Sequence, residues 1–241
     1  MDLSIQILQY VFSGITIGAI YAVIALGFTI IYNSTEVINF AQGEFVMLGG
    51  MAVIALDSNG HLPLGLSFIL AVVSVTLVGI LMERFTIRPA RSSNPIALII
   101  ITVGASIFLR GMAMMLWGKD ALGFKPFSGS DPIYLGGATL VPQSFWVLGV
   151  TIVVTVGLQF FFKGTITGKA MRACAFNRRA ASLAGISVNR MVLLSFALSA
   201  AIGAAAGIVI VPLKKNCRPA VTTMATPNTQ RLCGTRVAPP R

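Results

Sequence analysis

Apolar residues fall along the chain in long runs that short polar segments separate. A membrane-spanning helix needs roughly 20 apolar residues. Runs of about that length are 8–31, 62–82, 95–117, 145–162 and 191–213. A sixth and weaker run, 37–56, is broken by Glu44, and Arg110 interrupts the run at 95–117. The pattern predicts an all-α fold: a polytopic transmembrane bundle of five to six membrane segments, one of them discontinuous.

The composition supports burial in lipid. Of the 241 residues, 56% are hydrophobic and 10% are charged, whereas a soluble domain carries about 25% charged residues. We therefore expect residues 1–213 to form one multi-pass membrane domain. No basic segment and cleavage site surround the first run, so 8–31 is expected to be a retained span and not a signal peptide.

The net charge of +11 is distributed in a way that predicts topology. Basic residues gather at 84–94 and 163–190, whereas 118–144 balances both signs and contains a short candidate hairpin at 134–140. Because basic loops stay in the cytoplasm, we expect the first two segments inside and 118–144 outside. This distribution favours a topology signal over nucleic-acid binding. The N-terminus lies outside if 37–56 spans the membrane, and inside if it re-enters.

The segment 33–45, NSTEVINFAQGEF, places polar residues between apolar runs. Asn39 followed by Gln42 predicts an N-cap with its reciprocal partner, and hence a helix that starts near Asn39 after an unwound piece at 33–38. Irregular backbone at membrane depth is tolerated only inside protein or beside a water-filled cavity, and discontinuous helices build substrate sites in transporters. Alternatively, Glu36 and Glu44 sit at the interface and only cap or pair.

A short amphipathic cytoplasmic helix is predicted at 167–185, with Thr167 as N-cap and Gly185 as the residue that ends it. The residues on its apolar face are Ala173, Phe176, Ala180 and either Leu183 or Ala184. A small face of this kind suits docking into a groove of a partner protein. The alternative is a helix that lies on lipid headgroups.

Small residues recur every four positions in two of the apolar runs. One strip is Gly14, Gly18 and Ala22, and the other is Ser195, Ser199, Gly203 and Gly207. Small residues let helix backbones approach closely in lipid. Both strips therefore predict contacts between packed helices.

No catalytic or metal-binding pattern is present in the sequence. The segment GTITGKA, 164–170, has three residues between its glycines and Ala170 after the lysine, whereas a phosphate-binding loop needs four residues and then Ser or Thr. The cysteines Cys174, Cys217 and Cys233 lack metal-ligand spacing, and the single histidine is His61. We expect no metal, no cofactor and no enzymatic activity.

Two segments resemble a known family. The segment GFTIIYNSTEVINFAQGEFVMLGGM, 27–51, closely resembles the signature of bacterial ABC-importer permeases for branched-chain amino acids, the LivH type. The segment GKAMRACAFNRRAASLAGISVNRM, 168–191, is similar to the coupling loop of the same family. The resemblance covers about residues 5–213.

The resemblance implies a subunit of the bacterial inner membrane, in contact with membrane lipid, that pairs with a second permease. Two cytoplasmic ATP-binding subunits would drive transport, a periplasmic substrate-binding protein would deliver leucine, isoleucine or valine, and no nucleic acid would bind. Permeases for urea or short amides share the first motif, so this cargo stays open. A stand-alone secondary carrier is a further alternative, and a membrane-embedded enzyme is disfavoured.

Residue by residue, the resemblance implies two functional groups. The translocation path would be lined by Asn39, Gln42 and Glu44, with Glu36 behind them. The contacts with the ATPase would come from Ala173, Phe176, Ala180, Ala181 and Gly185. Many relatives place acidic residues where this chain has Phe176 and Asn177.

The segment 214–241 differs in character from the rest. It contains six basic residues, no acidic residue and four of the eleven prolines, and it shows neither helical nor strand periodicity. Permeases of this family continue here with further membrane helices. We expect a disordered tail that is not native to the fold and results from a frameshift or truncation, so that domain 1–213 is incomplete. The alternative is a genuine extension.

Overall fold

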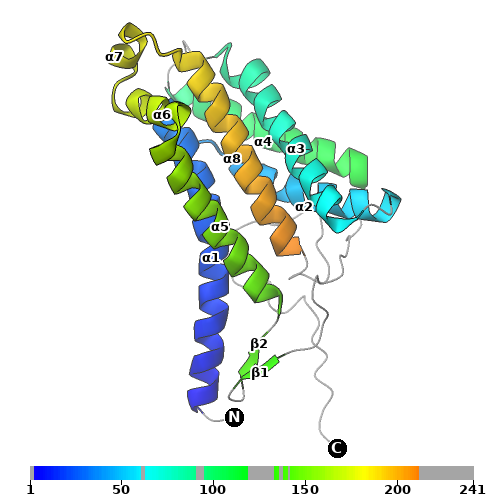
Figure 1. Ribbon diagram of the computed structural model, residues 1–241. Helices are drawn as coiled ribbons and strands as arrows, with labels where there is room; N and C mark the ends of the chain where they lie inside the picture. The colour runs from blue at the N-terminus through cyan, green and yellow to red at the C-terminus, as the bar shows by residue number, and fades with distance from the viewer. Residues whose placement is uncertain are drawn as a thin grey trace, which may run out of the picture.

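The computed structural model describes residues 3–60, 63–90, 95–118, 133–135, 138–140 and 142–211. Long helices form a bundle, and short helices cover one of its ends (Figure 1). The long helices are α1 (Leu3–Thr35), α2 (Gln42–Gly60), α3 (Leu64–Met82), α4 (Pro95–Trp117), α5 (Gln143–Gly164) and α8 (Val188–Ile210). The shorter elements are η1 (Glu83–Ile87), which continues α3, α6 (Ile166–Phe176), α7 (Arg178–Leu183), and the strands β1 (Ile133–Leu135) and β2 (Ala138–Leu140).

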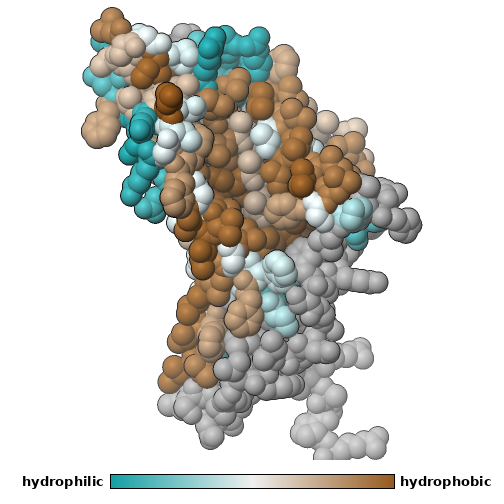
Figure 2. Space-filling view, viewed as in Figure 1, coloured by the Kyte–Doolittle hydropathy of each residue, from teal (hydrophilic) through white to brown (hydrophobic). Residues whose placement is uncertain are grey.

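The predicted membrane segments are confirmed. Five helices of the described chain, α1, α3, α4, α5 and α8, are long and apolar enough to cross a membrane. They coincide with the five apolar runs, and α2 is the sixth, weaker segment. Figure 2 shows apolar side chains over most of the bundle surface, with hydrophilic residues gathered around α6 and α7. The fold is a polytopic helical membrane bundle.

The two ends of the bundle differ. Strands β1 and β2 form the predicted hairpin within 118–144, with Ile133 paired antiparallel to Leu140. This hairpin marks one end, which we call the hairpin end (Figure 1). Helices α6 and α7 lie at the opposite end, toward which the C-terminal end of α3 also points (Figure 1); η1, which contains Arg84, continues α3 there. We call this the basic end.

The direction of α1 answers the question of whether 37–56 spans the bundle. Helix α1 contacts β2 at the hairpin end, and at the basic end the guanidinium of Arg178 donates to the carbonyl of Ser34. Helix α2 then returns toward the hairpin end, where Gly50 packs against Val211. The segment from Glu36 to the end of α2 is therefore a broken span. If the basic end is cytoplasmic, α1 begins outside.

Helix α8 is the centre of the bundle and packs against α1, α2 and α3. The predicted strip of small residues on α8 makes this packing possible. A Cβ atom on Gly207 would overlap the backbone of Val46, and a Cβ on Gly49 would lie 2.5 Å from the Cα of Ala204. The backbones of α2 and α8 are thus in direct contact.

The other strip behaves differently from the prediction. Gly14 and Gly18 are exposed, and a Cβ atom added to either would meet nothing within 4 Å. Ala22 is also exposed. This strip therefore makes no helix contact in the described part of the chain, because α1 turns another face toward α5 and α8.

The contact between α2 and α8 predicts a contrast between two glycine substitutions. Gly49→Ala should lower the free energy of unfolding by about 1–3 kcal/mol, the usual cost of overpacking. Gly14→Ala should not destabilise the protein, since its Cβ has open space and alanine is the better helix former. The measurement is SDS-induced unfolding of the purified protein in mild detergent. Equal effects of the two substitutions would contradict the close contact.

Candidate functional site

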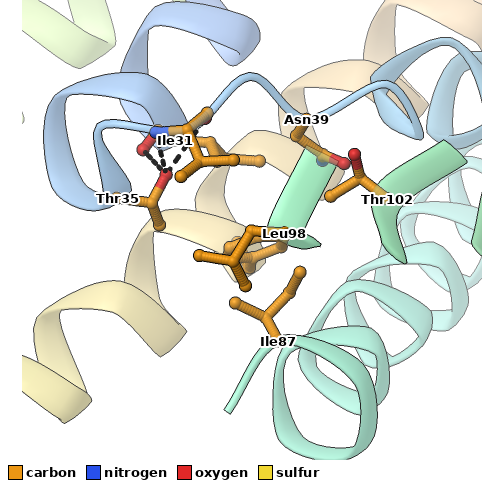
Figure 3. Close-up of a pocket in the computed structure, with 8 residues that line it drawn as sticks. Ile31, Thr35, Asn39, Ile87, Leu98 and Thr102 are labelled. Carbon is orange, nitrogen blue, oxygen red and sulfur yellow. Dashed lines mark hydrogen bonds between the residues drawn. The ribbon is translucent and has the colours of Figure 1, made fainter. Parts of the chain in front are cut away.

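The break between α1 and α2 lies at 36–41, later in the chain than the predicted 33–38. Helix α1 continues through Thr35, and α2 begins at Gln42 instead of near Asn39. Glu36 turns the chain with a φ of 56°, a left-handed conformation that is uncommon for a residue other than glycine. The Thr35 hydroxyl holds this turn by donating to the Ile31 carbonyl at 2.8 Å and accepting from the Val37 amide at 3.3 Å (Figure 3).

The predicted reciprocal cap between Asn39 and Gln42 is wrong. Asn39 Oδ1 accepts from the amide of Ala41 at 3.1 Å. The Gln42 side chain points away from Asn39 to α8, where Nε2 donates to the Ser199 carbonyl at 3.3 Å. A buried amide needs a partner for each polar atom, and α8 supplies both.

Gln42, Ser199 and Gly27 form a polar junction of three helices. The Ser199 hydroxyl lies 2.6 Å from Gln42 Oε1 and 2.7 Å from the Gly27 carbonyl. Both oxygens are acceptors for the single hydroxyl proton of Ser199. A Cβ atom on Gly27 would overlap the Gln42 amide. Ser199 lies midway along α8 (Val188–Ile210), so the junction lies at mid-depth of the bundle.

Glu44 is buried between α2 and α4. Its Oε1 accepts from the Ser106 hydroxyl at 2.9 Å and from Arg110 Nη2 at 2.6 Å. The side chain of Glu44 is 6% exposed and that of Arg110 is 44% exposed. The carboxylate and the guanidinium, which the sequence places in separate apolar runs, form one ion pair.

Three polar residues of α4 make up a polar stripe that faces the break: Thr102, Ser106 and Arg110. The Thr102 hydroxyl lies 3.5 Å from the amide of Phe40 and 3.4 Å from the carbonyl of Ile38. Sequence reasoning did not assign these residues to the site. Their four-residue spacing in an apolar helix is the signal that could have found them, since residues at i and i+4 share a face.

A small cavity lies beside the break, where Asn39 and Thr102 approach each other above Ile87 and Leu98 (Figure 3). Asn39 Nδ2 is buried and has no hydrogen-bond partner in the described chain. The cavity volume of about 10 Å³ is far below the roughly 300 Å³ of a small-molecule pocket. The described conformation is therefore closed to an amino acid at this level.

The four predicted residues of the break separate into two groups. Asn39, Gln42 and Glu44 are buried inside the bundle. Glu36 is exposed at the turn that follows α1, near the basic end. The structure thus brings three of the four residues into the interior and leaves Glu36 outside this group.

The predicted amphipathic helix is two helices, α6 and α7, which meet at Asn177. Thr165, and not Thr167, caps α6 by accepting from the Gly168 amide at 3.0 Å. Asn177 ends α6 and caps α7 by accepting from the Ala180 amide at 3.0 Å. Gly185 ends α7 as predicted, with a φ of 85°.

The face expected to dock a partner is exposed. Phe176 is 95% exposed and Leu183 is 90% exposed, and Ala173, Ala180 and Gly185 are also exposed. Ala181 differs, since it is 5% exposed and packs inward. Ala181 therefore does not belong to the exposed face.

Arg178 connects this exposed segment to the break. It is the first residue of α7, and its guanidinium donates to the carbonyl of Ser34 in the last turn of α1. Glu36 and its strained turn follow two residues later. This hydrogen bond ties the start of α7 to the end of α1.

The described ranges contain no candidate metal centre. No group of three or more His, Cys, Asp or Glu side chains there could hold a metal ion, and Cys174 is buried in α6. The predicted tail, 214–241, lies outside the described residues.

Comparison with known proteins gives a consistent picture. The family profile for the branched-chain amino acid transport system permease component matches residues 10–227. The high-affinity branched-chain amino acid permease protein LivH of Escherichia coli K12 is 33% identical over 217 residues, which cover 84% of this chain and 70% of the relative. LivH of Salmonella typhimurium is 32% identical with the same coverage. BraD of Pseudomonas aeruginosa is 29% identical over 216 residues, again 84% and 70%. No solved structure matches the chain.

The three-helix junction predicts unequal effects for two buried serines of α8. Ser199→Ala should lower the free energy of unfolding by about 1–3 kcal/mol, because it leaves the buried Oε1 of Gln42 without its donor, although Nε2 keeps the Ser199 carbonyl. Ser195→Ala is the matched control, because within the described residues this buried hydroxyl donates to its own helix alone, to the Met191 carbonyl at 2.9 Å. SDS-induced unfolding in mild detergent measures both. A larger loss from Ser195→Ala would refute the junction's role.

Proposed function

Because the chain belongs to the family of branched-chain amino acid transport system permease components, we propose that it is a membrane subunit of an ABC importer for leucine, isoleucine and valine. On this proposal it lies in the bacterial inner membrane and pairs with a second permease subunit. Two cytoplasmic ATP-binding subunits hydrolyse ATP, and a periplasmic binding protein delivers the amino acid. The subunit itself is not an enzyme.

The broken span is the main support for the proposed translocation path. Backbone that leaves the helical conformation at membrane depth needs protein or a water-filled cavity around it, and 36–41 returns from the basic end to the mid-depth of α8. Asn39 and Glu44 lie along this return beside the polar stripe of α4, whereas Gln42 between them turns to α8. Discontinuous helices of this kind form substrate sites in transporters.

The segment that resembles a phosphate-binding loop supports a division of labour with ATP-binding partners. Residues 164–170 form the end of α5 and the start of α6. The amide of Gly168 already donates to Thr165 Oγ1, and a Cβ atom there would lie 2.7 Å from the Cα of Phe162. A backbone packed in this way offers no cradle for phosphate at this loop, which supports assigning ATP hydrolysis to the partners.

The exposed face of α6 and α7 is the proposed docking site for an ATP-binding subunit. Phe176 and Leu183 are large apolar side chains that are almost fully exposed at the basic end, where Ala173 and Ala180 leave room between side chains. Large apolar anchors beside small residues suit insertion into a groove. Arg178 then transmits the movement of α7 to α1 and the break.

Urea and short amides remain the alternative cargo, and a stand-alone secondary carrier is the alternative mechanism. Uptake of labelled leucine by cells that express this chain with its partner subunits tests both. Uptake should require the ATP-binding subunits and should persist when the proton gradient is collapsed. Uptake without those subunits would contradict the importer.

Docking predicts that a charge on the exposed face prevents assembly. Ala180→Glu should reduce leucine uptake at least tenfold and should prevent co-purification of the ATP-binding subunits, because the unpaired carboxylate would be buried at the interface. Ser187→Glu is the control, since it adds the same charge at an exposed basic-end position outside α6 and α7. Normal assembly of the Ala180→Glu variant would show that this face does not dock.

If Arg178 transmits the movement of α7 to α1, its loss should uncouple transport from ATP hydrolysis while the complex still assembles. Arg178→Ala should leave the complex intact but lower the number of leucine molecules imported per ATP hydrolysed, because α7 no longer holds the Ser34 carbonyl. Arg179→Ala removes the same charge from the neighbouring exposed residue and should leave the ratio unchanged. Purified complex in proteoliposomes gives both rates. The proposed transmission fails if the two variants have equal ratios.

A further inference from the structure

The ion pair of Glu44 and Arg110 is buried on one side and open on the other. Within the described chain, the contacts of Arg110 with Glu44 run through one nitrogen, Nη2, to one oxygen, Oε1, which also accepts from Ser106. Glu44 is 6% exposed, but Arg110 is 44% exposed. A guanidinium has five N–H donors, so Arg110 keeps donors available on its open side.

The depth of the pair indicates what lies on that open side. Arg110 is seven residues before the end of α4 at Trp117, about 10 Å of helix rise. Glu44 lies two residues after the start of α2, which is level with the middle of α8. A charge that faces hydrocarbon at such a depth is costly. The open side therefore faces water or protein and not lipid tails.

We propose that Glu44 and Arg110 form a binding site for a zwitterionic amino acid, a proposal that rests on the proposed function as an importer permease. Arg110 receives the α-carboxylate, since a guanidinium binds carboxylates through two parallel hydrogen bonds. Glu44 receives the α-ammonium group. The substrate replaces one ion pair in the protein by two ion pairs between protein and substrate.

This exchange distinguishes the two candidate cargoes. Separating the pair leaves the buried carboxylate of Glu44 without its cationic partner, which is strongly unfavourable. A zwitterion compensates both charges, whereas urea or a short amide carries no charge and compensates neither. The site therefore selects amino acids over uncharged amides.

The surroundings leave room for the rest of the substrate. Gly43 precedes Glu44, and a Cβ atom there would meet nothing within 4 Å. Ile107 lies one turn before Arg110 on α4 and is 66% exposed. Residues three apart on a helix are neighbours, so Ile107 offers an apolar surface to a branched side chain beside the charged groups.

Cysteine protection in the assembled importer tests the site directly. The chain carries Gly43→Cys, with Cys174, Cys217 and Cys233 replaced by serine, and is purified with its partner permease and ATP-binding subunits. The rate of reaction with a water-soluble methanethiosulfonate is measured alone, with leucine, and with isovaleramide, an uncharged amide with the same branched chain. Leucine should slow the reaction and isovaleramide at the same concentration should not.

Variants of the pair complete the test. Glu44→Gln keeps the shape of the side chain and Arg110→Lys keeps the charge, and each should raise the leucine concentration for half-protection at least tenfold, about 1.4 kcal/mol. Their reaction rate without leucine reports whether the bundle remains folded. Replacing both residues together, Glu44→Leu with Arg110→Met, should abolish leucine uptake by a complex that still assembles.

The outcomes separate this site from the importer function. Failure of the Gly43→Cys thiol to react, equal protection by isovaleramide, or normal leucine uptake by the Glu44→Leu, Arg110→Met complex would each overturn the site. Leucine uptake driven by ATP without protection of the Gly43→Cys thiol would overturn the site and leave the importer function standing. Absence of ATP-dependent leucine uptake by the unmodified complex would overturn the importer function itself.

Discussion

Direct contact between the backbones of α2 and α8 is the constraint on which the rest of the bundle depends. Lipid tails are as apolar as leucine side chains, so helices associate in a membrane through close packing and not through the hydrophobic effect. Gly49 against Ala204 and Gly207 against Val46 bring the two helices together. This contact determines where α2 starts, because Gln42 has to meet Ser199 for both buried side chains to be hydrogen bonded.

The position of α2 then determines the polar interior. With Gln42 at mid-depth, Glu44 emerges toward α4 and needs a cationic partner, which Arg110 provides. The irregular backbone between the helices is held by Thr35 on one side and Thr102 on the other. A break that exposes backbone groups thus persists inside the bundle because side chains from α1 and α4 satisfy them.

A hydrogen bond also connects the region of the break to the basic end of the bundle. Arg178 binds the Ser34 carbonyl, and the chain reverses at Glu36 immediately after α1 ends. A left-handed glutamate stores strain that the surrounding contacts must hold. One hydrogen bond therefore joins the segment proposed to dock the ATP-binding subunit to the strained turn that precedes the proposed path.

The sequence by itself determined the membrane segments, the hairpin, the end of α7 at Gly185 and the buried strip of α8. Lipid imposes a minimum length and hydropathy on every span, and glycine readily adopts the left-handed conformation that ends a helix. Short stretches of sequence are therefore enough to predict these features. Tertiary structure alone decided that Gln42 pairs with Ser199 instead of Asn39, that Glu44 meets Arg110, and that Ala181 is buried. It also left the Gly14 strip without a partner in the described chain. These outcomes depend on which helix faces meet, and that is set by close packing between residues far apart in sequence.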